Sequence, residues 1–172
     1  MAYERRVVHL SGSLVPLAYL GDLLSWRTIQ YILAAGAALA LVLEFIRLFV
    51  GLDWAIYDRL TREYEQDNPA GYALAVVASA LVGWVFAPTI AVTALLLLTL
   101  VDPIAGVLGS ADSADTGKEP WVMATAFLVA MAITLLLLPL RATVPVALAV
   151  VAADALKPRV FGFVIDDNFS IP

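Results

Sequence analysis

The sequence contains no cysteine and a single histidine, His9, among its 172 residues. Without cysteine the chain forms no disulfide, has no thiolate nucleophile and builds no zinc–thiolate site. One histidine also rules out a metal centre held by several imidazole rings. These absences leave carboxylates, hydroxyls, amides and a few cationic groups to carry any chemistry.

Charge is scarce as well, at 15% of residues, and the formal net charge is −5. No basic patch is present, so we expect no nucleic-acid partner. Lysine is rarer than arginine and acids gather in loops such as GSADSADTGKE, a composition typical of proteins from a high-salt cytoplasm. The first residues, MAYERRVV, lack a small-residue cleavage pattern, so we expect no removable signal peptide.

Apolar residues dominate instead, at 62% of the chain, with a mean hydropathy of +0.91. A soluble domain is about half apolar and about a quarter charged, so this chain is too apolar to face water on all sides. Because a helix needs about 20 apolar residues to cross the hydrocarbon, the length leaves room for about six spans. We predict an all-α polytopic membrane bundle forming a single domain over residues 1–172. The expected spans cover residues 7–24, 28–50, 72–86, 89–101, 121–140 and 144–156, and residues 51–70 form an interfacial helix.

The positions of the basic residues predict the orientation of these spans. With a cytoplasmic N-terminus, only Arg27 and Arg141 fall outside. The other basic residues then lie inside or near that face, as the positive-inside rule requires. We therefore predict a multi-pass protein of the cell membrane whose polar groups gather on the cytoplasmic face.

Two polar residues at the edges of apolar segments are candidates for a site. His9 is one helical turn from Arg5, and the pair is either an interfacial anchor or a cationic pair for phosphate oxygens. Asp102 is either the N-cap of a helix whose first residue is Pro103 or a carboxylate that holds Mg²⁺ against phosphates. An acid between apolar runs is expensive and usually functional. Asp154 is a candidate for the same reason, whereas Glu44 and Arg47 are expected to form a structural ion pair.

The order of these features resembles the CTP-dependent polyprenol kinase family, which includes dolichol, phytol and diacylglycerol kinases and is related to the phosphatidate cytidylyltransferases. The family begins with a Glu, a basic pair and a His followed by a Gly, which here correspond to Glu4, Arg5, Arg6, His9 and Gly12. Its acidic motif, Gly-Asp-x-x-Ala-x-x-x-Gly, is similar to VDPIAGVLG, which keeps Asp102, Ala105 and Gly109 but has Val101 in place of the Gly.

Two later motifs continue the resemblance. A Lys-x-x-Glu-Gly motif is matched at Lys118 alone, since GKEPW lacks the Glu-Gly. The final motif, an acid, Pro-Arg and then Asp-Asn-x-x-x-Pro, corresponds to Asp154, Pro158, Arg159 and the stretch DNFSIP that begins at Asp167. Family members continue into another apolar helix after this Pro, so the resemblance implies that a final span is lacking here.

The resemblance implies a kinase that transfers phosphate from CTP to a membrane lipid alcohol, with Mg²⁺ as cofactor. The catalytic residues it implies are His9, Asp102 and Asp167. Mg²⁺ would bind to Asp102 and Asp167. The residues implied to bind nucleotide phosphates are Arg5, Arg6, Lys118, Arg159 and Asn168.

Two other functions remain open on the sequence. A cytidylyltransferase would use the same face and metal to form a CDP-lipid from a lipid phosphate. A non-catalytic transporter or assembly subunit would place its acids along a path between helices. The residues do not identify the lipid, which could be dolichol, geranylgeraniol, phytol or diacylglycerol, nor do they distinguish CTP from ATP or fix the oligomeric state.

Overall fold

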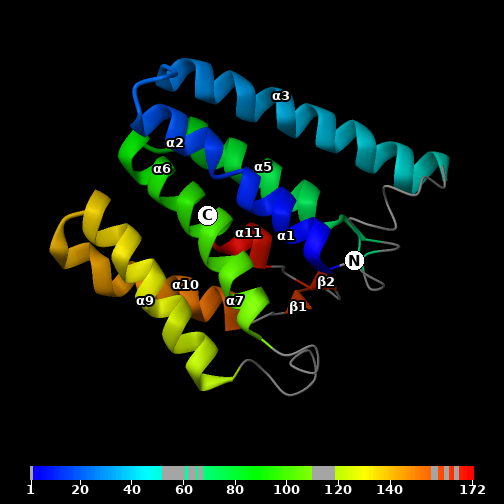
Figure 1. Ribbon diagram of the computed structural model, residues 1–172. Coiled ribbons are helices and arrows are strands. Elements are labelled where there is room, and N and C mark those ends of the chain that lie inside the picture. The colour runs from blue at the N-terminus through cyan, green and yellow to red at the C-terminus, as the bar shows by residue number, and fades with distance from the viewer. Residues whose placement is uncertain are drawn as a thin grey trace.

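The computed structural model is a bundle of helices that run back and forth between two ends (Figure 1). The structure describes residues 2–51, 61, 65, 68–109, 119–155, 159–160, 163–164 and 167–172, without the side chains of residues 2–6, 159–160, 163–164 and 167. The α-helices are α1 (Ala2–Ser11), α2 (Leu14–Leu20), α3 (Trp26–Phe45), α5 (Gly71–Val85), α6 (Pro88–Leu96), α7 (Asp102–Leu108), α9 (Pro120–Leu137), α10 (Leu140–Ala155) and α11 (Asp167–Ser170). Two π-helical segments, η1 (Ile46–Val50) and η3 (Leu97–Val101), continue α3 and α6, and two-residue strands β1 (Arg159–Val160) and β2 (Phe163–Val164) pair as an antiparallel hairpin.

The predicted helical class is confirmed, because the described residues are almost entirely helical. Three of the helices are long and apolar enough to cross a membrane: Trp26–Val50, Pro88–Leu108 and Pro120–Leu137. Shorter apolar helices cover Val7–Leu20 and Gly71–Val85. The expected total of about six spans therefore stays a prediction, and the expected interfacial helix lies mostly outside the described residues.

The first expected span, 7–24, is divided by a turn. Helix α1 ends at Ser11, and α2 begins three residues later at Leu14. Pro16 lies in the first turn of α2, where its missing N–H is not needed. The chain then turns through Asp22, which has a φ of 56°, and Ser25 caps α3 by accepting a hydrogen bond from the backbone N–H of Thr28 at 3.2 Å.

Helices α3 and α5 lie antiparallel and in close contact, as paired residues along their length show. At one end Gln30 Nε2 donates to the carbonyl of Gly83 at 3.0 Å. At the other, the Tyr72 hydroxyl donates to Glu44 at 2.6 Å. A Cβ on Gly36, between these contacts, would lie 3.3 Å from Val76 Cγ1. Small residues at the crossing thus let two apolar helices approach closely, as in membrane bundles.

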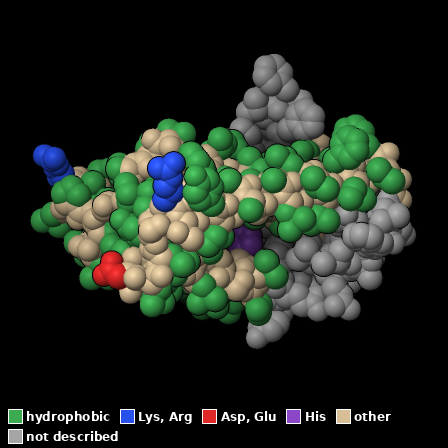
Figure 2. All heavy atoms as spheres, turned by 90° about the horizontal axis from the view of Figure 1, so that it is seen from above, with side chains coloured by type: hydrophobic (Ala, Val, Ile, Leu, Met, Phe, Trp, Pro, Cys, Tyr) green, Lys and Arg blue, Asp and Glu red, His purple; other side chains and the backbone are tan. Residues whose placement is uncertain are grey.

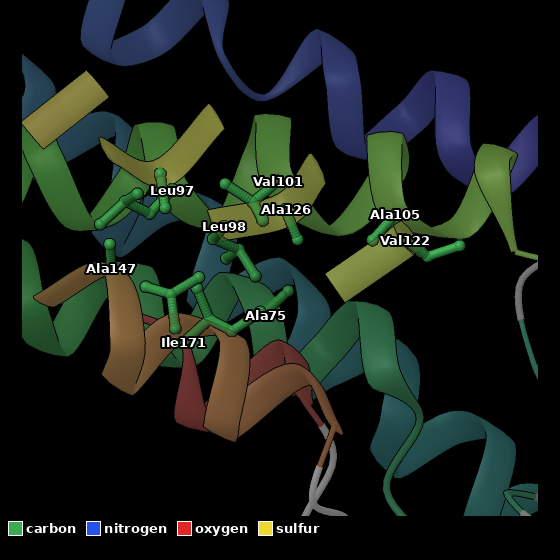
Figure 3. Packing of buried hydrophobic residues seen from close by; sticks show 11 residues of the cluster. Ala75, Leu97, Leu98, Val101, Ala105, Val122, Ala126, Ala147 and Ile171 are labelled. Atoms are coloured by element: carbon green, nitrogen blue, oxygen red, sulfur yellow. The ribbon is translucent and has the colours of Figure 1, made fainter. Parts of the chain in front are cut away.

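The largest core cluster joins η3, α7, α9, α10 and the C-terminal residues (Figure 3). Helix α9 contributes the small residues Ala126 and Ala130, one turn apart, and α10 contributes Ala147; all three are fully buried. Leu98 and Val101 of η3 fill the space beside them. In the described part of the face in Figure 2, hydrophobic side chains are widespread and charged ones are few, which is expected of helices in contact with lipid.

Candidate functional site

The polar group that defines the site is the pair of His9 and Asp102. His9 lies in the last turn of α1, and its Nδ1 is 3.3 Å from Oδ2 of Asp102, the first residue of α7. The histidine side chain is 7% exposed and the aspartate 20%. Two residues from the predicted catalytic set, far apart in the sequence, therefore meet in a largely buried position.

Gly12 allows this meeting. A Cβ at Gly12 would lie 3.0 Å from the Thr99 Cγ2 atom and 3.0 Å from the carbonyl oxygen of His9. Since His9 contacts Asp102 while Gly12, three residues later, contacts Thr99, three residues earlier, the two helices are antiparallel here. In the motif of His9 and Gly12, the glycine is therefore explained by the close packing of α1 against η3. Sequence reasoning missed Thr99, although its spacing of three from Asp102 places it on a neighbouring face.

The helix is continuous through Asp102, the first residue of α7, so the interpretation of Asp102 as an N-cap is wrong. Asp102 has φ −60° and ψ −50°, and Val101 before it is also helical. The apolar helix runs without a break from Pro88 to Leu108, seven residues past the end expected from the sequence. Pro103 cannot donate to the carbonyl of Thr99 and its ring crowds that carbonyl, and the π-helical η3 occupies the turn just before it. We attribute the π-helical segment to this proline.

The ring nitrogens of His9 are buried without a well-formed hydrogen bond among the described residues. The contact between Nδ1 and Asp102 has a short distance but not the angle of a hydrogen bond. A buried polar nitrogen without a partner is unfavourable and calls for an explanation. Figure 2 shows the histidine side chain in purple, set back in a recess of the surface. The ring is thus held close to a carboxylate with its other nitrogen, Nε2, directed elsewhere.

The remaining predicted residues are described only in part. Arg5 and Arg6 lie in α1, Arg159 in β1 and Asp167 in α11, but their side chains are not among those described. Lys118 falls wholly outside the described residues. Asn168 is 2% exposed and lies in α11, which packs against α5 and α10. The structure thus joins His9 to Asp102 and buries Asn168.

A second polar cluster lies at the end of α3. Both carboxylate oxygens of Glu44 accept from Arg47, at 3.0 Å from Nε and 2.8 Å from Nη2. The same carboxylate accepts from the backbone N–H of Ala70 at 3.0 Å and from the Tyr72 hydroxyl at 2.6 Å. Arg47 also donates to the carbonyl oxygens of Glu65 and Asn68. These bonds match the expected structural ion pair, and they tie the segment before α5 to α3.

The donors for a metal are few in the part of the chain that the structure describes. No three His, Asp or Glu side chains converge there. Mg²⁺ needs only one or two carboxylates when phosphates and water complete its shell, and the Asp102 carboxylate, partly exposed, is of the right kind. The second carboxylate expected from the sequence, Asp167, has no described side chain.

Comparison with protein-family models, with curated proteins and with solved structures gave no match to this chain.

Proposed function

We propose that this protein is a multi-pass membrane enzyme that phosphorylates a lipid alcohol of the polyprenol type, with CTP as phosphoryl donor and Mg²⁺ as cofactor. The single observation that carries the proposal is the contact of His9 with Asp102, 3.3 Å apart and largely buried. An acid and a base that meet inside an apolar bundle are expensive to keep there, and such groups are usually functional. The three long apolar helices support the membrane location.

The arrangement of the helices supports a proposed orientation with the N-terminus in the cytoplasm. Arg27 is in the first turn of α3 and Arg141 is in the first turn of α10, and both helices begin at the same end of the bundle (Figure 1). Because these are the two basic residues expected outside, we assign that end to the external side. The N-terminus of α1 lies toward the other end, which we therefore assign to the cytoplasm, where nucleotides are found.

The proposed reaction moves one phosphoryl group. A bond forms between the lipid hydroxyl oxygen and the γ-phosphorus, the bond from that phosphorus to the β-phosphate oxygen breaks, and CDP leaves with the electron pair. His9 accepts the hydroxyl proton at Nε2, the nitrogen turned away from the carboxylate, and the adjacent Asp102 carboxylate stabilises the imidazolium charge that forms. Mg²⁺, when held by Asp102 and Asp167, would neutralise charge on the nucleotide phosphates.

The other residues of the proposal bind the nucleotide. Arg5, Arg6, Lys118 and Arg159 would pair with phosphate oxygens, and Asn168 would donate a hydrogen bond from its amide. Such groups act by positioning and by charge neutralisation, which account for most of the catalysis in phosphoryl transfer.

The test is incubation of the purified protein in lipid vesicles with CTP or ATP labelled at the γ-phosphate. Parallel reactions contain several lipid alcohols or the corresponding lipid phosphates, which a cytidylyltransferase would need as substrate. We expect label in the lipid. Label in released pyrophosphate would instead identify a cytidylyltransferase, and absence of transfer from both CTP and ATP to every lipid would reject the kinase and leave a non-catalytic membrane protein.

Asp102→Asn then tests the site. Asn has the shape of Asp but neither its charge nor its affinity for Mg²⁺, so we expect the rate of transfer to fall by about 10²–10⁴-fold. Asp22→Asn is the matched control, since Asp22 is an exposed residue in the turn between α2 and α3. Undiminished turnover in Asp102→Asn would remove this residue from the mechanism.

A further inference from the structure

Aromatic side chains gather at one end of the bundle. Tyr19 and Trp26 contact edge to face with centroids 5.2 Å apart, and Tyr31 and Trp84 do the same at 6.1 Å. They come from the last turn of α2, the first turns of α3 and the last turn of α5. We call these four residues, together with Arg27, the aromatic end.

The aromatic end is partly exposed although it is rich in apolar area: Tyr19 and Trp26 are half-buried against the core, and the other members are exposed. Tyr31 is 55% exposed and Trp84 53%, and Arg27, between Trp26 and the next turn, is exposed as well. The Trp84 indole N–H donates to the carbonyl oxygen of Gln30 at 3.2 Å, which fixes this ring against α3. Rings with one apolar and one polar part, held rigidly beside a cation, suit a zone that is neither water nor hydrocarbon.

The spacing of the polar residues along α3 agrees with a position of the aromatic end at the membrane boundary. Arg27 and Arg47 are 20 residues apart on one continuous helix, Trp26–Val50, which corresponds to about 30 Å at about 1.5 Å per residue. That length equals the roughly 30 Å of bilayer hydrocarbon. Between Arg27 and Glu44 the exposed large side chains are Tyr31 and then only aliphatic residues, Ile32, Leu39, Leu41 and Val42. The polar groups of this helix thus stand one bilayer thickness apart.

We propose that the aromatic end lies in the headgroup zone of one leaflet, with the rings of Trp26 and Trp84 at the boundary of the hydrocarbon and the Arg27 guanidinium on lipid phosphates. The Glu44–Arg47 cluster then lies at the boundary of the opposite leaflet. The charge of Arg27 complements lipid phosphate, and two rigid aromatic pairs on three helices fix the depth of the bundle. This inference does not depend on catalysis.

The experiment measures the depth of single tryptophans in phosphatidylcholine vesicles. The chain has four tryptophans, and replacing three of them by Phe leaves either Trp26 or Trp84 alone. Fluorescence is then quenched by lipids that carry a spin label either near the headgroup or near the end of the acyl chain. We expect both tryptophans to be quenched at least about 2-fold more strongly by the label near the headgroup.

The matched control is Leu39→Trp in a chain with no other tryptophan. Leu39 is 61% exposed and lies 12 residues beyond Arg27, near the middle of the proposed span. We expect the opposite preference, for the label near the end of the acyl chain. Deep quenching of Trp26 and Trp84, or no quenching by either lipid while Leu39→Trp responds, would overturn the proposal. Using two separate single-tryptophan chains keeps the test valid if one of them fails to fold.

Discussion

The ion pair of Glu44 and Arg47 offers the sharpest prediction about stability, with Glu44→Gln as the perturbation. The carboxylate accepts four hydrogen bonds, two at each oxygen: Arg47 Nε and the Tyr72 hydroxyl at Oε1, and Arg47 Nη2 and the Ala70 N–H at Oε2. A Gln amide has one oxygen, so its NH₂ group must replace one of these acceptors. The more favourable orientation places the NH₂ group at the Oε1 position, where the Tyr72 hydroxyl can accept a hydrogen bond from it. In that orientation the NH₂ group also faces Arg47 Nε, so two donors oppose each other there.

The expected loss follows from this count. One charge-assisted bond disappears and the charge that neutralises Arg47 disappears with it, in a position where Glu44 is 6% exposed. A hydrogen bond to a charged group contributes about 1.5–3 kcal/mol, and breaking a buried pair costs about 3–5 kcal/mol. We expect a loss of about 3 kcal/mol, equivalent to about 6–12 °C in the midpoint of thermal unfolding for a chain of this size.

The assay is thermal unfolding in detergent micelles, followed by circular dichroism. Tyr72→Phe, which removes one neutral donor at 2.6 Å, is the control, and we expect it to lower the midpoint by no more than about half as much. Glu44→Leu combined with Arg47→Met removes both charges and is expected to be less harmful than Glu44→Gln alone. Equal stability of Glu44→Gln and the wild type would refute the buried, fully bonded arrangement.

Two further substitutions test the close helix contacts. Gly12→Ala places a Cβ 3.0 Å from Thr99 Cγ2, so that α1 must move away from η3. We expect a loss of about 1–3 kcal/mol in unfolding free energy and a lower rate of the proposed lipid phosphorylation. Unchanged stability and turnover would contradict this contact. Gln30→Ala removes the hydrogen bond to the carbonyl of Gly83, a group near the end of α5 that has no partner within its own helix. We expect this change to lower the free energy of unfolding by about 1 kcal/mol in the same assay. A neutral result would mean that this bond does not hold α3 to α5.

The helices could be predicted from the sequence because lipid-compatible helices need long apolar runs, and these are visible without any tertiary information. The predicted segments 28–50 and 121–140 correspond to Trp26–Val50 and Pro120–Leu137. The expected end at residue 101 was wrong because Asp102 and Pro103 look like a helix start. In the bundle the helix continues through them with a π-helical turn, because a backbone group without a hydrogen bond is strongly unfavourable in an apolar environment.

The site was predictable only as a set of residue types. Polar groups are rare in apolar sequence, and this rarity identified His9 and Asp102 as candidate site residues. Their contact, however, depends on an antiparallel crossing of helices that Gly12 permits. Likewise, the spacing of Glu44 and Arg47 predicted their pairing, whereas the donors from Ala70 and Tyr72 come from a segment more than 20 residues away. No local pattern encodes which carbonyl or hydroxyl a folded chain will bring to a buried charge.

The sequence by itself thus determined the helical class and the apolar outer surface, because composition and hydropathy decide whether a segment is more stable in lipid or in water. Only the tertiary structure decided which polar groups meet, because a buried polar contact depends on the packing of several helices, and small residues such as Gly12 and Gly83 set how closely those helices approach.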